Sequence, residues 1–455
     1  MDQRCGESAF SERRAIRPLR VIVIGAGIGG LAVGLCMRRT GHDVRILEKR
    51  QAITEIGAGI QLAPNASRIL QRFGIFEEAM KYATVLEQNS SRRWDNDAEL
   101  GSIPLVPNVE EQFGIPLGVI HRADLLNVLL EAALDCGCQL LTNHQAIDTD
   151  ENFLPKTNET HRRILVRSNE IDTWMSADLI VAADGINSII RKRMAAASGY
   201  IDTLGSVRES AYRFMLPLEL VEKDETVMAL LHKNHGMRYL GPGGHVMAYP
   251  LRNNTLYNVV LVRTYDCEKE TQGSWTTPGD KEEMREHYRG WNPVVQALIQ
   301  HAPDSEVLET PMNNMPPLPT WVKGQIALAG DACHFMLPYV AQGAANAIED
   351  AATLAMAFTC TDNIELALDM YQQVRKSRSE RIQASAKRTG YALHLPDGEE
   401  QRSRDESIRA VSQGSGGENP DQWNDRQSRE YMWRVDVMAQ TISRFESLVE
   451  NLDKD

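Results

Sequence analysis

The stretch from Arg20 to Glu48, RVIVIGAGIGGLAVGLCMRRTGHDVRILE, decides the fold. Residues 20–24 form a short apolar run, which predicts a buried strand. Residues 28–40 predict a helix, and residues 44–48 predict a second strand. A strand, a helix and a second strand in this order open a parallel α/β sheet.

A glycine-rich turn, GAGIGG at residues 25–30, joins the first strand to the helix. Gly25 permits the tight turn, Gly27 lets the backbone approach a pyrophosphate, and Gly30 lets the helix pack closely on the sheet. The helix N-terminus adds free N–H groups and a positive dipole end. Glu48 ends the second strand, where a carboxylate can accept hydrogen bonds from a ribose diol and would repel a 2′-phosphate. We therefore expect bound FAD or NAD.

Two later apolar runs end in the same kind of residue. DLIVAAD (178–184) is followed by GINSIIR, and QIALAGD (325–331) is followed by ACH. Each run places an Asp and a Gly at the carboxyl end of a strand, the edge where ligands bind in open α/β sheets. An Asp there can hold a polyol, and FAD has a ribityl chain where NAD has a second ribose. These motifs favour FAD over NAD.

Taken in this order, the three motifs resemble those of the single-component FAD-dependent aromatic hydroxylases, the p-hydroxybenzoate and salicylate hydroxylase type. The resemblance covers about residues 20–360 and includes GAGIQLAPNA (57–66), HRADL (121–125) and GPGGHVMAYPL (241–251). The GDACH and PYVAQGAANAIEDA segments are most similar to the salicylate and 6-hydroxynicotinate branch and to fungal secondary-metabolite monooxygenases.

The expected fold class is α/β, with a Rossmann-like FAD-binding domain, an interleaved antiparallel-sheet substrate domain and a C-terminal helical region. We expect the FAD-binding domain to comprise residues 18–75, 114–195 and 300–360, and the substrate domain to comprise residues 76–113 and 196–299. Residues 361–455 should form C-terminal helices with a mobile polar loop at 396–427, because that stretch is polar and rich in glycine.

The resemblance implies roles for individual polar residues around FAD. Glu48 should hold the adenosine ribose, and Arg122 should reach the diphosphate or the ribityl region. Asp331 should bind the ribityl hydroxyls. Asp184 and Arg191 belong to a motif that serves both FAD and the reduced nicotinamide cofactor.

The start of the predicted helix after residue 342 should contact the flavin itself. Backbone N–H groups at Gly343 and Ala344 are expected to face the pyrimidine edge of the flavin and to stabilise its anionic reduced form. The commoner family pattern has Gly at position 341, where this chain has Ala341. Alanine lacks the backbone freedom of glycine, which bears on how the flavin moves and how NAD(P)H reaches it.

The implied activity is an FAD-dependent monooxygenase that consumes NADPH or NADH and O2 and hydroxylates a phenolic or polyketide-like aromatic molecule through a flavin hydroperoxide. Hydroxylation or epoxidation of an indole alkaloid stays open as an alternative. So does a flavin oxidase or dehydrogenase, which would need no NAD(P)H to return H2O2, and so does a redox-sensing flavoprotein without enzyme activity. The chain is expected to be a monomer or a homodimer.

Candidate catalytic residues lie on the predicted middle sheet. Arg213 in AYRF should face the flavin and anchor or activate the substrate, because a nearby cation favours a phenolate. Tyr239 in MRYLGPGGH is the candidate that would complete a phenol-activating pair. Gln61, Pro338 and Tyr339 are expected to line the substrate pocket. A structural ion pair for Arg213 and a packing role for Tyr239 compete with these assignments.

Three further residues look catalytic by type. His245 and Tyr249 lie four residues apart, on one face of a strand, and packing is the favoured interpretation for both. His334, inside GDACH, is expected to brace its loop.

Composition excludes several classes of protein. The formal net charge is −13, which argues against a general nucleic-acid binder. Seven scattered cysteines, with Cys136 and Cys138 the one close pair, fit neither a disulfide framework nor a metal site. The first twenty residues lack the apolar core of a signal peptide, and no apolar run approaches the roughly 18–20 residues of a membrane span. We therefore expect a cytoplasmic protein that binds neither membranes nor metals.

Overall fold

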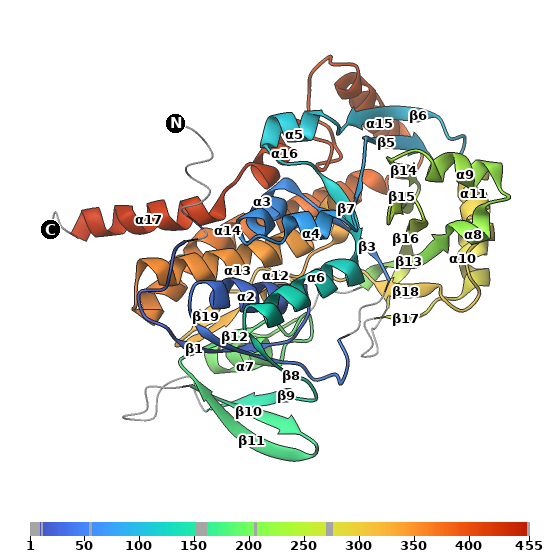
Figure 1. The fold of residues 1–455 in the computed structure, drawn as a ribbon. Helices are drawn as coiled ribbons and strands as arrows, with labels where there is room; N and C mark the ends of the chain where they lie inside the picture. The colour runs from blue at the N-terminus through green and yellow to red at the C-terminus, as the bar shows by residue number, and fades with distance from the viewer. Residues whose placement is uncertain are drawn as a thin grey trace.

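Two large sheets organise the chain (Figure 1). The computed structural model describes residues 10, 12–53, 57–150, 162–203, 207–269 and 276–452. The six-stranded sheet lies beneath helices α2, α13 and α14, and the eight-stranded sheet lies to the right in Figure 1. The two halves of the molecule are therefore built on separate sheets.

The six-stranded sheet has the order β19-β20-β12-β1-β2-β8. Its strands are β1 (Arg20–Ile24), β2 (Asp43–Leu47), β8 (Gln139–Leu141), β12 (Leu179–Ala182), β19 (Val322–Lys323) and β20 (Ile326–Leu328). All neighbours are parallel except the edge pair β19 and β20. The predicted strand, helix and strand unit is thus confirmed as the centre of a Rossmann-like sheet.

Helices cover this sheet and connect it to the rest of the chain. The principal helices of this half are α2 (Ile28–Arg39), α6 (Arg122–Asp135), α7 (Ile189–Ser198), α12 (Asp331–His334) and α13 (Gly343–Cys360). Helix α2 contacts both α6 and α13. A small sheet of β9 (Gln145–Thr149), β10 (Arg162–Ser168) and β11 (Ile171–Ala177) lies at the lower end of Figure 1.

The eight-stranded sheet has the order β17-β18-β13-β16-β15-β14-β5-β6 and is antiparallel except between β14 and β5. Its strands are β5 (Gln88–Arg93), β6 (Glu99–Pro104), β13 (Val207–Pro217), β14 (His235–Gly241), β15 (Gly244–Leu251), β16 (Leu256–Lys269), β17 (Thr277–Pro278) and β18 (Leu308–Pro311). One face, here called the outer face, packs on α8 (Leu218–Val221), α9 (Glu225–Leu231), α10 (Lys281–His287) and α11 (Pro293–Gln300).

The opposite face of this sheet, here called the inner face, looks toward the half of the molecule that contains the six-stranded sheet. Tyr212 and Phe214 of β13 are buried in the outer core, so Arg213 between them lies on the inner face. A third sheet of β3 (Gly59–Leu62), β7 (Gly118–His121) and β4 (Thr84–Val85) joins the two halves, together with α3 (Pro64–Arg72), α4 (Phe76–Met80) and α5 (Asn108–Phe113).

The C-terminal region is helical, as expected, but it is more ordered than its composition suggested. It consists of α14 (Ile364–Leu393), α15 (Glu399–Ser412), α16 (Arg426–Trp433) and α17 (Val437–Leu452). The expectation of a loop over 396–427 is wrong for α15, which packs against β6. Four residues of α15 are buried, and they recur at helical spacing: Gln401, Arg404, Asp405 and Ile408. Because three of the four are polar, the sequence shows no hydrophobic periodicity there.

The α/β fold class is confirmed, whereas the predicted domain boundaries stay a prediction. In the part of the chain that the structure describes, no helix combines the length and the apolar character needed to cross a membrane.

Candidate functional site

The carboxyl ends of β1, β12 and β20 meet at one edge of the six-stranded sheet. Gly25 has φ +97°, and a Cβ on it would lie 2.5 Å from the carbonyl oxygen of Ala183 at the end of β12. A Cβ on Gly30 would lie 1.9 Å from the carbonyl oxygen of Gly25. Both positions therefore require glycine so that the turn and α2 can pack against the sheet.

Other glycines at this edge border open space instead. A Cβ at Gly27, Gly185 or Gly343 would meet no atom within 4 Å. Gly27 is the N-cap residue of α2 and Gly343 is the first residue of α13, and both helices have no side-chain cap and no acidic residue in the first turn. In contrast, Asp280 caps α10. Open space beside uncapped N–H groups at two helix N-termini suits the diphosphate and the flavin oxygens of FAD.

The two helix starts lie close together. A Cβ on Gly29 of α2 and a Cβ on Gly330, just before α12, would each lie 3.3 Å from Cβ of Ala347 on α13. The glycine-rich turn, the Asp331 loop and the first turns of α13 thus converge on one place. The residues present fit a dinucleotide laid across the edge of the sheet.

Three carboxylates surround this edge. Glu48 accepts hydrogen bonds from the N–H groups of Ala26 (3.0 Å) and Arg50 (2.9 Å), so it lies directly beside the glycine-rich turn. Asp184 accepts a hydrogen bond from the N–H of Ile189 (2.9 Å), and its other oxygen, Oδ1, is buried with no hydrogen-bond partner among the described residues.

Asp331 is the third carboxylate at this edge. It forms no hydrogen bond or ion pair with any residue that the structure describes. Burial raises the pKa of Asp331, and the nearby Arg122 opposes that rise. Arg122 begins α6 and donates its backbone N–H to the carbonyl of Ala58 (2.8 Å). Asp331 and Arg122 therefore lie close together, and Arg122 also contacts Ala58, which comes just before β3.

Arg191 differs from the other predicted cofactor residues because protein groups occupy its guanidinium. It is fully buried and pairs with Asp202 (2.8 Å). It also donates to the carbonyl oxygens of Ile186 (2.6 Å) and Ala332 (3.3 Å). These hydrogen bonds link α7 to α12, so Arg191 holds the loops at this edge of the sheet in position.

A buried ion-pair network fixes the start of α13. Arg375 and Arg378 of α14 both bind Glu349, and Arg375 also binds Asp350 (2.8 Å). Burial alone would raise the pKa of Glu349, but Arg378 and Arg375 outweigh it and hold that pKa below its ordinary value. His334 donates to Asp350 (2.6 Å), which agrees with its expected role in bracing the loop.

The same region contains the described group whose side chains best resemble metal ligands, Cys333, His334 and Asp350. Asp350 already accepts hydrogen bonds from His334, from Arg375 and from the N–H of Gly330 (2.8 Å). These hydrogen bonds show that Asp350 belongs to the ion-pair network.

On the substrate side, Arg213 lies at the centre of the inner face. It is opposite Val260 of β16, which is opposite Met247 of β15, and all three are only half-buried although their strands are central. Arg213 makes no hydrogen bond or ion pair with other described residues. Burial lowers the pKa of its guanidinium, and Tyr249 opposes that shift. The structure therefore holds a partly desolvated cation that has no protein anion beside it.

The position of Tyr239 corrects one prediction. The hairpin between β14 and β15 pairs Tyr239 with Val246, and the Tyr239 side chain packs in the outer core. It lies on the opposite face from Arg213 and cannot complete a pair with it. Tyr249 of β15 lies on the same inner face as Arg213, and its phenol is close to Gly59, where a Cβ would be 2.4 Å from Oη.

The three predicted pocket residues have different environments. Gln61 accepts a hydrogen bond from Nε1 of Trp423 (2.9 Å). Pro338 is exposed, whereas Tyr339 is buried and packs so closely on α14 that a Cβ on Gly390 would be 2.5 Å from its ring. Their roles as substrate contacts stay predictions.

The sequence reasoning missed a segment, residues 419–425, that covers the inner face. Asp421 in this segment forms a buried ion pair with Arg238 of β14. Asn424 donates to Asp421 (2.9 Å) and to Oγ of Ser91 on β5 (3.3 Å). Because this stretch is polar and glycine-rich, its composition gave no sign that its side chains would be buried.

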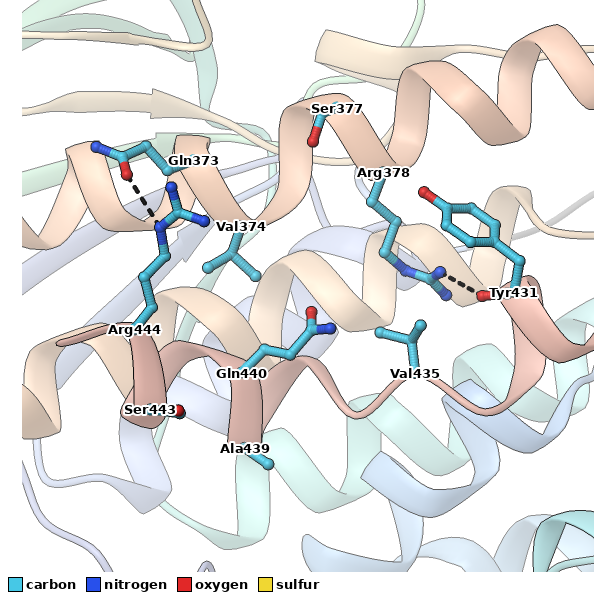
Figure 2. Close-up of a pocket in the computed structure, with 10 residues that line it drawn as sticks. All are labelled: Gln373, Val374, Ser377, Arg378, Tyr431, Val435, Ala439, Gln440, Ser443 and Arg444. Carbon is cyan, nitrogen blue, oxygen red and sulfur yellow. Dashed lines mark hydrogen bonds between the residues drawn. The ribbon is translucent and has the colours of Figure 1, made fainter. Parts of the chain in front are cut away.

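A separate groove of about 590 Å³ lies between α14 and α17, on the far side of the ion-pair network (Figure 2). None of its lining residues is a predicted site residue. Figure 2 shows Arg378 donating to the carbonyl oxygen of Tyr431, so that Arg378 forms the inner wall of the groove. The groove therefore shares Arg378 with the ion-pair network but includes none of the predicted site residues.

Known proteins share this combination of features. A family model described as an FAD binding domain matches residues 18–386. The FAD-dependent monooxygenase ntnJ of Nectria sp is 35% identical over 402 residues, which cover 87% of this chain and 90% of that protein. The 6-hydroxynicotinate 3-monooxygenase of Bordetella bronchiseptica is 34% identical, with 80% and 89% covered. A solved salicylate hydroxylase substrate complex has the same fold, with a TM-score of 0.75 at 24% identity over 94% of this chain and 98% of that one.

Proposed function

Because this chain belongs to the family of FAD-dependent monooxygenases, we propose that it hydroxylates a small aromatic molecule whose ring carries an ionisable oxygen. Curated relatives are named for 6-hydroxynicotinate and 3-hydroxybenzoate, which are both hydroxylated aromatic acids. Phenolic and polyketide-like aromatic molecules are the leading candidate substrates of this chain. An indole is the alternative substrate, and the screen described below includes it.

The observation that carries this proposal is the Arg213 cation. It lies half-buried at the centre of the inner face, without an anionic partner among the described residues. A partly desolvated cation gains most from an anionic ligand, such as a phenolate or an aromatic carboxylate. Tyr249 lies beside it and can donate a hydrogen bond to the same ligand. Both groups therefore favour the ionised substrate, whose ring is more nucleophilic.

FAD, when bound, supplies the redox and oxygen chemistry of the reaction. The residues of the chain bind and orient the cofactor and the substrate, and they shield the inner face from water. Asp331 and the N–H groups of α2 and α13 would hold the cofactor, and the Arg375 and Arg378 network keeps α13 in place. Residues 419–425 cover the inner face and exclude water from it.

We also propose NADPH or NADH as the electron donor and the cytoplasm as the compartment, because reduced nicotinamide cofactors are held there. A monomer or a homodimer is the proposed assembly, and light scattering of the FAD-loaded protein tests it.

The test of the proposed function is a screen of NAD(P)H consumption over phenols, hydroxylated aromatic acids and indoles, with product mass read in ¹⁸O2. We expect one ¹⁸O atom in the product. Arg213→Ala should abolish product while FAD stays bound, and Asp331→Ala should lose FAD. Arg208→Ala, an exposed change on the same strand, is the matched control and should keep the wild-type rate. Product formation by Arg213→Ala at the wild-type rate, or H2O2 release without NAD(P)H, would overturn the proposal.

A further inference from the structure

Three cysteines lie together where helices α2 and α6 end. Cys136 directly follows α6, Cys138 directly precedes β8, and Cys36 lies in the last turn of α2. A Cβ on Gly34 of α2 would be 3.6 Å from Sγ of Cys138, so this thiol packs against α2. Cys136 is half-buried, whereas Cys36 and Cys138 are only 2% and 6% exposed. Cys136 is therefore the member of this group that a small solute can reach.

A tight turn at Gly137 brings its two neighbouring cysteines together. Gly137 has φ +96°, and its N–H donates to the carbonyl oxygen of Leu134 (2.9 Å). The N–H of Cys138 donates to the carbonyl oxygen of Ala133 (3.0 Å) in the same turn. Extended chain would place the Cα atoms of Cys136 and Cys138 about 7 Å apart, and a turn places them closer. Because a disulfide needs a Cα separation of roughly 4.4–6.8 Å, this turn suits a bond between the two sulfurs.

Two arginines at the end of α2 lie near Cys136. Nε of Arg38 donates to the carbonyl oxygen of Cys136 (3.0 Å). Hydrogen bonding from Cys138 and the positive charges of Arg39 and Arg38 lower the pKa of Cys136, and they outweigh the effect of burial. The same hydrogen bond, together with burial, raises the pKa of Cys138. When Cys136 is protonated, its thiol can instead donate to the carbonyl oxygen of Ala133 (3.2 Å). Cys136 is thus the more acidic and more nucleophilic of the two thiols.

We propose that Cys136 and Cys138 form a redox-active dithiol that hydroperoxides oxidise to an intramolecular disulfide, with Cys136 as the attacking residue and Cys138 as the resolving residue. This site goes beyond the proposed function and does not depend on it. One residue separates the two cysteines, so they do not form a Cys-x-x-Cys motif, and the sequence pattern assigned them no role. Helix α6 has 14 residues, which places the dithiol roughly 20 Å from Arg122 at the other end of that helix.

The oxidation proceeds in two balanced steps. In the first, the thiolate of Cys136 attacks the terminal oxygen of the hydroperoxide, so that an S–O bond forms and the O–O bond breaks. The other oxygen leaves with the electron pair of that bond and takes a proton, which gives an alcohol, or water when the oxidant is H2O2. In the second step, Cys138 loses its proton and attacks the sulfur of the Cys136 sulfenic acid. The S–S bond forms, the S–O bond breaks, and hydroxide leaves as water with the proton from Cys138.

Peptide mapping of the FAD-loaded protein tests the proposal directly. The wild type is treated with H2O2, its remaining thiols are alkylated, and the tryptic peptides are analysed by mass spectrometry. We expect the peptide that contains Cys136 and Cys138 to lose two hydrogen atoms and to escape alkylation, and we expect dithiothreitol to reverse both changes. If both cysteines are still alkylated after the treatment, or if either is joined to a third cysteine or to a second chain, the proposal is wrong.

Serine variants separate the roles of the two cysteines. Cys138→Ser should stop at the sulfenic acid of Cys136, which dimedone traps, whereas Cys136→Ser should leave Cys138 reduced and open to alkylation after unfolding. Cys360→Ser is the matched control and should form the disulfide as the wild type does. Cys360 is also half-buried, but burial raises its pKa and its Sγ lies 3.9 Å from Oγ1 of Thr359. A dimedone adduct on Cys138 in Cys136→Ser would contradict the assigned roles.

The pH profile of alkylation gives a readout that does not depend on oxidation. The rate at Cys136 should rise with pH at a lower midpoint than the rate at Cys360, because the thiolate is the reacting form. Cys138→Ala removes the hydrogen bond to Cys136 and should move that midpoint to higher pH. A midpoint for Cys136 at or above that of Cys360 in the wild type would refute its assignment as the attacking residue.

Discussion

Replacing Gly27 by alanine should separate the stability of the protein from its affinity for FAD. Gly27 has φ −76° and ψ −179°, a conformation that alanine adopts without strain. The added Cβ would meet no atom of the protein within 4 Å. The free energy of unfolding of the apoprotein should therefore stay the same or rise by about 0.4–1 kcal/mol, because alanine restricts the unfolded chain.

The affinity for FAD should fall in the same variant. The methyl group would occupy the open space beside the N-terminus of α2, where we propose that the diphosphate approaches the backbone. Losing one hydrogen bond to a charged group costs roughly 1.5–3 kcal/mol. At 1.4 kcal/mol for each factor of ten, the dissociation constant of FAD should rise roughly 10- to 100-fold.

Gly30→Ala is the matched comparison, because its Cβ would overlap the carbonyl oxygen of Gly25 at 1.9 Å. That variant should lose stability by roughly 2–3 kcal/mol or more, since the turn must move away from α2. Urea unfolding of the apoproteins and fluorescence titration with FAD measure the two effects. If Gly27→Ala binds FAD as tightly as the wild type, the open space at Gly27 is not where the diphosphate lies, and the assignment of this edge is wrong.

Three further predictions concern stability. Ala341 adopts a left-handed conformation (φ +51°), so Ala341→Gly should raise the free energy of unfolding by about 0.5–1 kcal/mol in urea titrations. Asp421→Asn leaves the buried Arg238 cation without its partner and should cost roughly 3–5 kcal/mol in the same assay, whereas a loss below about 1 kcal/mol would contradict the burial of this pair. The pKa of Glu349 is depressed in the folded state, so its contribution to the free energy of unfolding is complete above its ordinary pKa of 4.5 and is lost as the pH falls below that value. Arg378→Met removes one of the cations that depress this pKa. Acid unfolding of this variant, followed by circular dichroism, should therefore occur at higher pH than in the wild type.

The FAD half of the molecule could be predicted because its signals are local. The turn from Gly25 to Gly30 is recognisable from its glycines, and the strands on either side are contiguous apolar runs. Asp331 could be placed at the edge of the sheet for the same reason, since only Ala329 and Gly330 separate it from a buried strand. Each of these inferences needs only a residue and its near neighbours in the sequence.

The substrate half depends on register and on distant contacts, which a single sequence does not specify. The sequence predicted that Arg213 faces the flavin. Deciding between Tyr239 and Tyr249, however, needed the pairing of β14 with β15, because a shift of one residue moves a side chain to the other face. Oε1 of Glu209 and Nδ1 of His394 lie 3.2 Å apart, but the two residues are 185 residues apart in sequence, and no local pattern links them. Ala341 was expected to lack the freedom of glycine, yet the structure places it in the left-handed region.

The covering of the inner face has a consequence for how such an enzyme changes during evolution. His394, Asp421 and Trp423 all lie beyond residue 386, where the match to the FAD-binding family ends. The stretch that covers the inner face is therefore separate in sequence from the matched residues, which contain both the glycine-rich turn and Arg213. Exchanging the terminal stretch between two relatives would replace the cover of the inner face while leaving the glycine-rich turn and Arg213 in place.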